Sequence, residues 1–245
     1  MPHIFSKKPF FIIVTCILIL TTALFFLINP IIQSHIEEKQ ATTQNSSKYC
    51  IVLDAGHGAN DPGKIGINNV LEKDINLSIV LKLKPLLENK GFYVVLTRDS
   101  DKILASEDSS SIKRDDMIAR VNLIKETSPI LTVSIHQNSF TDSSSKGPQV
   151  FYYTSSTESK ALADNMQNRM NQILSPEKER TPQKNDSYYL LKNSPTPIII
   201  AECGFLSNSY EADLLTTELY QLKVARSVYF GIIDYCKTNH LIPIS

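Results

Sequence analysis

The sequence has no excess of charge of either sign, because 25 lysines and arginines are matched by 25 aspartates and glutamates. This balance argues against a protein that binds nucleic acid through a strongly basic surface, so no nucleic-acid partner is expected. A hydrophobic content of 42% likewise excludes a disordered chain. The length of 245 residues suits one globular domain of ordinary size, and no internal repeat is visible.

Cysteine is scarce, and its spacing carries little information. The four cysteines contain no C-x-x-C pair. Cys16 lies in an apolar run near the N-terminus, which leaves an odd number for the rest of the chain. We therefore predict no disulfide, and a bond between Cys50 and Cys236 stays an open alternative.

Glycine is also scarce, yet four of the eight glycines fall in the segment "GHGANDPGKIG" around His57. Glycine tolerates positive φ and close approach of other groups, so the backbone has a special task here. Gly58 to Lys64 matches the phosphate-loop pattern G-x-x-x-x-G-K. The match fails because Ile65 stands where a magnesium-binding Ser or Thr is needed and Pro62 removes an amide, which disfavours nucleotide binding.

The N-terminal 30 residues form a separate segment. Residues 10–28 carry no charge and are about long enough to cross a hydrocarbon core of about 30 Å. Lys7 and Lys8 precede this run, which predicts a cytoplasmic N-terminus and an extracytoplasmic remainder. We predict an uncleaved transmembrane helix. The alternative, a cleaved signal peptide, is disfavoured by the length of the run and the lack of an A-x-A site. Residues 31–48 read as a polar linker.

From residue 49 to about 240, β-branched runs alternate with helical patterns. This alternation predicts a single α/β domain with a mostly parallel mixed sheet flanked by helices. The expected strands are 50–54, 93–97, 130–135, 149–153 and 198–201. The expected helices are 72–90, 112–126, 159–174 and 219–238. Pro85 predicts a kink or break in the first helix, because an internal proline removes a hydrogen bond. The segment 175–186 is expected to be a surface loop.

Two histidines and two glutamates stand at positions that favour a metal site. His57 and His136 follow two predicted strands, at the edge where open α/β sheets bind ligands. Glu72 opens the first helix, and Glu202 ends an isoleucine-rich strand, where a buried carboxylate needs a charged partner or a metal. Two imidazoles and one carboxylate form a His₂Glu zinc set, and a second carboxylate would serve as general base. Spacing alone does not assign the two glutamates.

Four separated motifs occur in a recognisable order: "LDAGHG", "LEKDINL", "SIHQNS" and "AECGFLSN". Together they resemble the zinc-dependent N-acetylmuramoyl-L-alanine amidases over residues 51 to 235. The stretches "KRDDMIARVNLIK" and "DSYYLLK" further resemble the germination-specific branch that acts on spore cortex. The resemblance implies that His57, Glu72 and His136 bind Zn²⁺ and that Glu202 is catalytic. Ala59 departs from the family, where many members have a second glycine after the histidine.

The resemblance implies a peptidoglycan hydrolase that cleaves the amide between N-acetylmuramic acid and L-alanine of the stem peptide. It also implies action in the envelope of a developing spore, before a muramic acid deacetylase forms the muramic δ-lactam. An envelope lipoprotein is a further expected partner. The competing hypothesis is a catalytically silent, membrane-anchored peptidoglycan-binding protein on the same fold. Arg98 and Arg114 either hold substrate carboxylates or form surface ion pairs, and the ion pairs are favoured. The sequence leaves open the roles of Asn138 and Tyr188.

Overall fold

The computed structural model describes residues 22, 24–30, 32–33, 49–106 and 109–243. The chain divides into two compact units, Met1–Asn45 and Ser46–Ser245. The described residues of the first unit are helical. Within the described residues, no helix is both long and apolar enough to cross a membrane. The predicted transmembrane run and the predicted polar linker lie largely outside the described residues, so both stay predictions.

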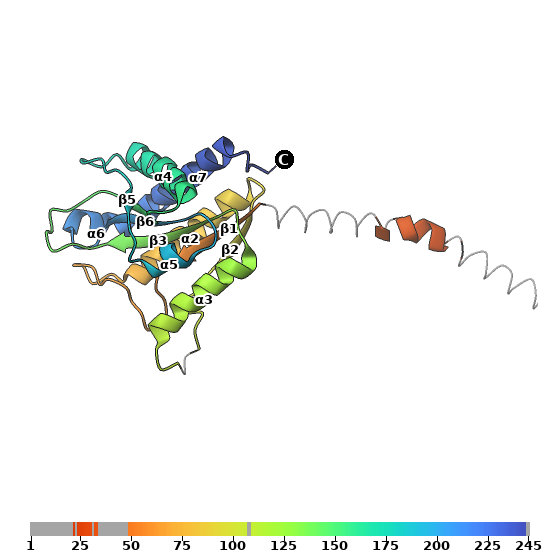
Figure 1. The fold of residues 1–245 in the computed structure, drawn as a ribbon, viewed down its shortest axis with the longest axis horizontal. Helices are drawn as coiled ribbons and strands as arrows, with labels where there is room; N and C mark the ends of the chain where they lie inside the picture. Colours follow the sequence, from red (N-terminus) through yellow and green to blue (C-terminus); the bar gives the residue numbers. More distant parts are fainter. Residues whose placement is uncertain (1–21, 23, 31, 34–48, 107–108, 244–245) are drawn as a thin grey trace, which may run out of the picture. The chain divides into compact units, whose positions relative to one another are not determined.

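The second unit is built on a six-stranded sheet (Figure 1). Its strands are β1 (Cys50–Ala55), β2 (Tyr93–Leu96), β3 (Leu131–Asn138), β4 (Gln149–Tyr152), β5 (Gln183–Lys184) and β6 (Ile198–Phe205). The spatial order is β2-β1-β3-β6-β4-β5. Neighbouring strands run parallel except β4 and β6, which are antiparallel. The predicted α/β fold with a mostly parallel mixed sheet is therefore confirmed.

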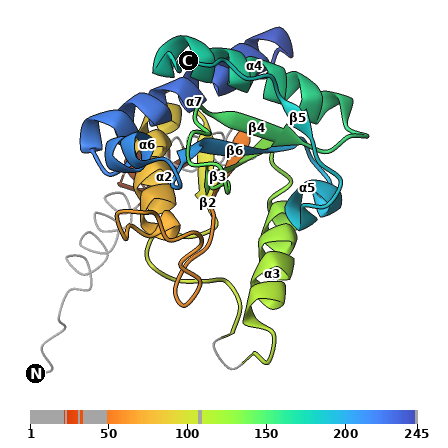
Figure 2. The same cartoon turned by 90° about the vertical axis from the view of Figure 1, so that its left-hand side faces the viewer.

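Helices cover the two faces of this sheet unequally. They are α2 (Glu72–Glu88), α3 (Ile112–Thr127), α4 (Thr157–Leu174), α5 (Tyr189–Asn193), α6 (Ser209–Leu215) and α7 (Glu218–Thr238). The long helices α2, α4 and α7 enclose the larger apolar cluster with one face of the sheet. Among the described residues, only α3 and the short α5 pack on the other face (Figure 2). They cover a much smaller apolar cluster.

Alternation along the central strands assigns each side chain to a face. Ile51 and Leu53 of β1 belong to the larger cluster, whereas Val52 belongs to the smaller one. In β6, Ile199 lies in the larger cluster and Ile200 in the smaller one. Successive side chains of a strand point to opposite faces, so polar residues two positions along from Val52 and Ile200, with their partners on β3, lie on the same face as these two, which is the face covered by α3 and α5. These residues are Asp54, Ser134, His136 and Glu202.

Several predicted boundaries need correction. The helix α2 continues through Pro85 to Glu88 instead of breaking. Pro85 lies on the exposed side of the helix together with Leu81, four residues earlier, whose carbonyl lacks its usual helical donor. The strands β3 and β6 extend beyond their predicted ends and contain His136 and Glu202 within them. The sequence patterns also missed α5, α6 and the two-residue β5, which are too short to show a periodicity.

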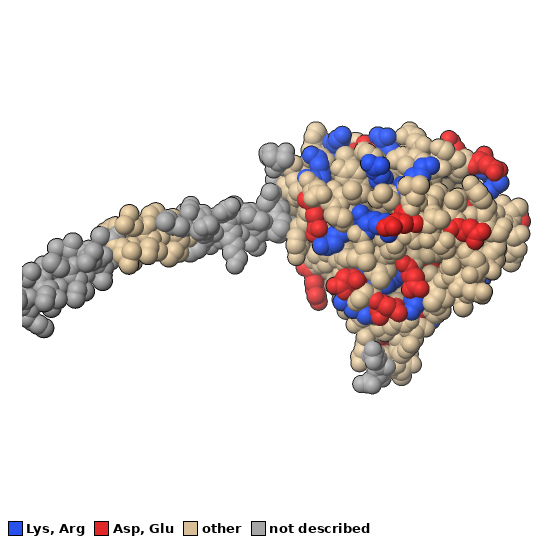
Figure 3. All heavy atoms as spheres, turned by 180° about the vertical axis from the view of Figure 1, so that it is seen from behind, with Lys and Arg blue, Asp and Glu red and all other residues tan. Residues whose placement is uncertain are grey.

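The remaining features of the second unit agree with the composition. Basic and acidic side chains are interspersed on the face seen in Figure 3, with no large area of one sign. The cysteines Cys50, Cys203 and Cys236 are all buried and free, so the disulfide left open above does not form in this structure.

Candidate active site

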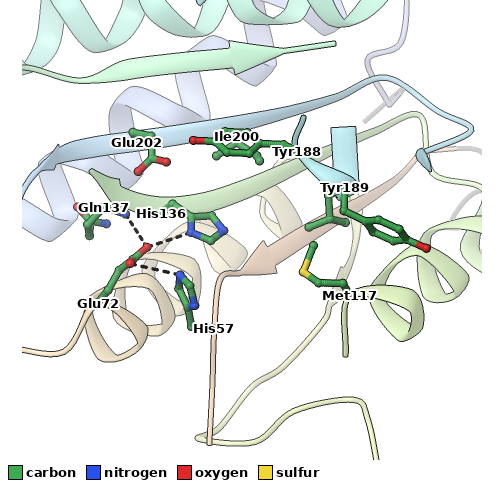
Figure 4. A pocket seen from close by; sticks show the side chains of 10 residues that line it. His57, Glu72, Met117, His136, Gln137, Tyr188, Tyr189, Ile200 and Glu202 are labelled. Atoms are coloured by element: carbon green, nitrogen blue, oxygen red, sulfur yellow. Dashed lines mark hydrogen bonds and ion pairs between the residues drawn. The ribbon is translucent and has the colours of Figure 1, made fainter. Parts of the chain in front are cut away.

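The sheet itself brings His136 and Glu202 together. The two residues are direct partners in the parallel pairing of β3 with β6, so their side chains project side by side from the same face. The regular register ends immediately after them, where the pairing shifts between His136 and Asn138. Figure 4 shows both side chains directed toward the same pocket.

His57 enters this pocket from the loop that follows β1. Its backbone lies in the left-handed region, with φ of 63°, which turns the chain sharply after the strand. The ring atom Nδ1 lies 2.8 Å from Oδ2 of Asp61, four residues later. This contact fixes the ring and leaves Nε2 facing Glu72, 3.2 Å from its Oε2. Asp61 thus orients His57 in the way that carboxylates orient metal-binding histidines.

Glu72 is the first residue of α2, and its carboxylate is held by neighbours on all sides. Oε1 lies 2.9 Å from Nδ1 of His136 and accepts a hydrogen bond from the backbone amide of Gln137 at 3.0 Å. Oε2 accepts a hydrogen bond from the backbone amide of Lys64 at 2.8 Å. The carboxylate therefore sits between the two imidazoles, as the dashed lines in Figure 4 show.

Two of the clustered glycines make room for these side chains, which answers why glycine gathers here. A Cβ at residue 56 would lie 2.2 Å from Cε1 of His136. Gly63 has φ of 69°, and a Cβ there would lie 2.6 Å from Oε2 of Glu72 and from Cδ2 of His57. Any larger residue at Gly56 or Gly63 would push a site residue out of position.

The two glutamates differ electrostatically. Burial would raise the pKa of the Glu72 carboxyl, but hydrogen bonds to His136 and His57 outweigh it and hold this pKa well below its usual range. Burial also raises the pKa of Glu202, in this case to about 7. Oε2 of Glu202 is buried and has no hydrogen-bond partner among the described residues. Glu72 is therefore a fixed anion, and Glu202 is a carboxyl group available to an added ligand.

The structure thus brings all four predicted residues into one pocket and separates them into two kinds. One nitrogen or oxygen atom from each of His57, Glu72 and His136 lies within 4.8 Å of the others, close enough to share a metal ion. Two imidazoles and one carboxylate suit Zn²⁺ in chemical type and number. Glu202 lines the same pocket but stands outside this trio.

An apolar wall completes the pocket, which has a volume of about 290 Å³. It is formed by Met117 of α3, Ile200 of β6 and the residues Tyr188, Tyr189 and Leu190 at the start of α5. Because α5 was not predicted, this wall was also missed. The aromatic pair in "DSYYLLK" was the available signal.

Two buried arginines hold the loop that carries His57. Arg120 of α3 donates hydrogen bonds to the carbonyl oxygens of Ala55 and His57 and pairs with Asp54. Arg98 donates to the carbonyl oxygens of Ala55 and Gly56. Arg98 therefore serves neither of the roles considered for it, substrate binding or surface pairing.

Arg114, the other arginine whose role was open, does not line the pocket. Arg114 is exposed and lies 3.7 Å from Asp115, as a surface pair would. Sequence reasoning missed Arg120 because "KRDDMIAR" reads as a solvated helix surface.

Comparison with known proteins agrees with this geometry. The model of the N-acetylmuramoyl-L-alanine amidase family matches residues 51–234. The chain belongs to this family. The germination-specific N-acetylmuramoyl-L-alanine amidase of Bacillus subtilis is 37% identical over 188 residues, which cover 76% of this chain and 78% of that protein. The predicted family and reaction are thereby confirmed: the protein is an N-acetylmuramoyl-L-alanine amidase.

Solved structures show the same relationship. The CwlD amidase from Clostridioides difficile, solved in complex with the GerS lipoprotein, superposes on this amidase with a TM-score of 0.75 at 38% identity, covering 78% of this chain and 99% of that one. The catalytic domain of CwlV from Bacillus (Paenibacillus) polymyxa var. colistinus gives a TM-score of 0.68 at 30% identity, covering 77% and 98%. Nearly the whole of each of these two structures therefore corresponds to the amidase domain of this chain.

Proposed function

We propose that this amidase is zinc-dependent and that His57, Glu72 and His136 hold the ion. The proposal rests on one observation: ligand atoms from three separate segments lie within 4.8 Å of one another, in the pocket that Glu202 also lines. One oxygen of the Glu202 carboxyl group has no hydrogen-bond partner among the described residues. When bound, Zn²⁺ would polarise the scissile carbonyl and lower the pKa of a water molecule to about 7. Asp61 and Gln137 hold His57 and Glu72 in place for this task.

Glu202 is proposed as the general base and acid. Its pKa of about 7 lies near neutral pH, where a proton acceptor and donor works best. The attacking water would lose its proton to Glu202 as its oxygen bonds to the lactyl carbonyl carbon. Glu202 would then return this proton to the nitrogen of L-alanine as the C–N bond breaks. Without this proton the amine would be a poor leaving group.

The cellular setting is proposed from the relatives. We infer that the substrate is peptidoglycan of the spore cortex, since a relative with 37% identity is germination-specific. The enzyme would act outside the cytoplasm, with residues 1–30 as a membrane anchor or signal segment, residues 31–48 as a linker and residues 49–240 as the catalytic domain. The structure of a relative in complex with a lipoprotein supports an envelope lipoprotein as a partner. A muramic acid deacetylase would then use the product to form muramic δ-lactam.

The proposal is tested by digesting purified peptidoglycan with the full chain and analysing the products by mass spectrometry. With added Zn²⁺ we expect free stem peptides and glycan strands with free lactyl groups, and a chelator should abolish both. Binding to the wall without any cleaved product would instead support the silent binding protein. Assays with and without the candidate lipoprotein distinguish a silent protein from an enzyme that needs its partner.

The metal ligands are tested separately from the reaction. His57→Ala and His136→Ala should each reduce bound zinc well below one equivalent, because each removes a direct ligand. His240→Ala is the matched control, since His240 lies near the C-terminus of the domain and does not line the pocket. Full zinc content in either site variant would contradict the ligand assignment.

A further inference from the structure

The pocket contains a polar group that the proposed mechanism does not use, the hydroxyl of Tyr188. Tyr188 is half-buried and lines the pocket together with His57, Glu72, His136 and Glu202. The Tyr188 hydroxyl forms no hydrogen bond with any described residue. This inference rests on the proposed function, because it assigns that hydroxyl a role in the same reaction.

The neighbourhood of Tyr188 fixes the position of its ring. The backbone amide of Tyr188 donates a hydrogen bond to Oδ1 of Asn185 at 2.9 Å, and the amide of Ser187 donates to the same oxygen at 2.8 Å. The amide of Asn185 donates in turn to the carbonyl oxygen of Tyr152, at the end of β4. The Tyr188 ring packs edge-on against Phe151, with 5.6 Å between ring centroids. The side chain is therefore held by the sheet.

Two adjacent tyrosines point in different directions. In Figure 4 the hydroxyl oxygen of Tyr188 is directed toward Glu202, whereas the Tyr189 hydroxyl points away from the cluster. Tyr189 is 42% exposed. Burial raises the pKa of Tyr188, and the nearby charges of Glu202 and Glu72 raise it further. At neutral pH its hydroxyl is thus a protonated hydrogen-bond donor that faces the two glutamates.

The reaction creates a demand for such a donor. When water adds to the amide carbonyl, the π electron pair moves to the carbonyl oxygen, which becomes an oxyanion. Donors preorganised toward that oxygen stabilise the transition state more than the ground state. Among the other described polar residues of the pocket, Glu72 lies between the two imidazoles as an acceptor, and Glu202 is engaged with the proton of the attacking water. The side-chain amide nitrogen of Gln137 already donates to Asn76, and the Tyr189 hydroxyl points away from the cluster.

We propose that the Tyr188 hydroxyl donates a hydrogen bond to the oxygen of the scissile carbonyl and stabilises the oxyanion that forms on it. The hydroxyl keeps its proton throughout. The proton of the attacking water goes to Glu202 and then to the departing amine, so the hydrogen bond of Tyr188 adds no further transfer. Tyr188 would therefore be a further catalytic residue. It lies on the side of the pocket opposite Glu72.

The test compares two substitutions that each remove one oxygen atom, Tyr188→Phe and, as the control, Tyr93→Phe. Tyr93 is 50% exposed at the start of β2 and does not line the pocket. Hydrolysis of a soluble N-acetylmuramoyl peptide is measured with the zinc-loaded full chain. We expect kcat of Tyr188→Phe to fall about 10- to 100-fold, somewhat less than the loss of a donor from a fully enclosed oxyanion site. KM, bound zinc and thermal midpoint should stay near those of the wild type, because the ring still packs on Phe151. Tyr93→Phe should retain nearly full activity.

A second readout separates oxyanion stabilisation from a general loss of activity. A phosphinate analogue of the muramoyl–alanine linkage places a charged oxygen where the oxyanion would form. Its inhibition constant should increase for Tyr188→Phe by the same factor as kcat/KM decreases, and should not change for Tyr93→Phe. Unchanged kcat in Tyr188→Phe, a change in KM alone, or unchanged binding of the analogue would overturn the proposal. Lack of wild-type cleavage in the same assay would instead refute the proposed function.

Discussion

Two buried carboxylates on the same face of the sheet have opposite surroundings. Asp54 on β1 is fully buried and accepts hydrogen bonds from Arg120, Ser134 and Thr97. Burial would raise the pKa of Asp54, but the Arg120 charge and the Ser134 and Thr97 hydroxyls outweigh it and lower the pKa to about 2. Glu202 on β6 is buried without such partners, and its pKa rises to about 7.

This difference separates a structural acid from a chemical one. Every oxygen of Asp54 is occupied, so its charge supports the fold and is unavailable to a ligand. Glu202 has an unpaired oxygen in the pocket, which costs folding free energy and leaves the group free to exchange a proton. Burial of an acidic residue therefore does not by itself indicate catalysis. An acidic residue that is buried without a hydrogen-bond partner, beside three residues that can hold a metal ion, does indicate it. The following experiments test this contrast.

Glu202→Gln should have the largest effect on activity. We expect kcat to fall by about 10² to 10⁴, because the general base is lost. Bound zinc should stay near one equivalent, since Glu202 lies outside the three proposed ligands. The metal-free variant should unfold at no lower urea concentration than the wild type at pH 8, because an ionised, unpartnered group has been removed. Glu218→Gln, on the surface of α7, is the control; full activity in Glu202→Gln would end the assignment.

Arg120→Met should instead act on stability. It leaves the Asp54 charge buried without its partner, which costs about 3–5 kcal/mol in comparable pairs. It also releases the carbonyl oxygens of Ala55 and His57. The free energy of unfolding from urea titrations measures the loss, and Arg114→Met, which alters an exposed arginine, should change it by less than about 0.5 kcal/mol. Equal stability of the two variants would show that Asp54 does not need the guanidinium.

The acid dependence of stability should reveal Asp54 directly. Its pKa is lower in the folded chain than the usual 3.8, so its contribution is complete above about pH 4 and is lost as the pH falls toward 2. The loss amounts to about 2 kcal/mol. Urea unfolding of the metal-free protein between pH 5 and pH 2 should therefore show a steeper decline for the wild type than for Asp54→Asn. Parallel curves would disprove the low pKa.

Asp61→Ala should have the smallest effect, and it concerns a third, partly exposed carboxylate. The contact between Asp61 and Nδ1 of His57 orients the ring without contributing to the proposed ligand trio. Loss of such a contact weakens metal binding by about 10-fold or somewhat more. Competition with a chromophoric chelator measures the zinc affinity. Asp61→Asn keeps an acceptor oxygen and should lose less; an affinity equal to that of the wild type in both variants would argue against an orienting role.

Much of this architecture could be predicted from local patterns. The strands around residues 50–55 and 198–201 are apolar enough to identify, and parallel strands bring the residues at their carboxyl ends to one edge. That is why His57, His136 and Glu202 could be grouped although they are far apart in the sequence. The resemblance to the family then distinguished the role of Glu72 from that of Glu202.

The predictions failed where the position of a residue depends on contacts between elements that are distant in the sequence. Glu202 lies inside β6 rather than at its end, because the pairing of β6 with β3 resumes beyond it, between Asn138 and Phe205, after the shift in register. Arg120 is buried only because α3 packs over the end of β1, which its own charged neighbourhood does not indicate. Tyr188 depends on a five-residue helix that shows no periodicity. Each of these requires knowledge of the neighbouring element.

The contact between Gly56 and the His136 ring has a consequence for the evolution of this enzyme. The imidazole occupies the volume in which every other amino acid would carry its first side-chain carbon. Selection for hydrolysis therefore acts on a position that contributes no functional group of its own. A saturation library scored for wall-degrading ability should find residue 56 as intolerant of change as the histidines, although no reaction scheme would include it.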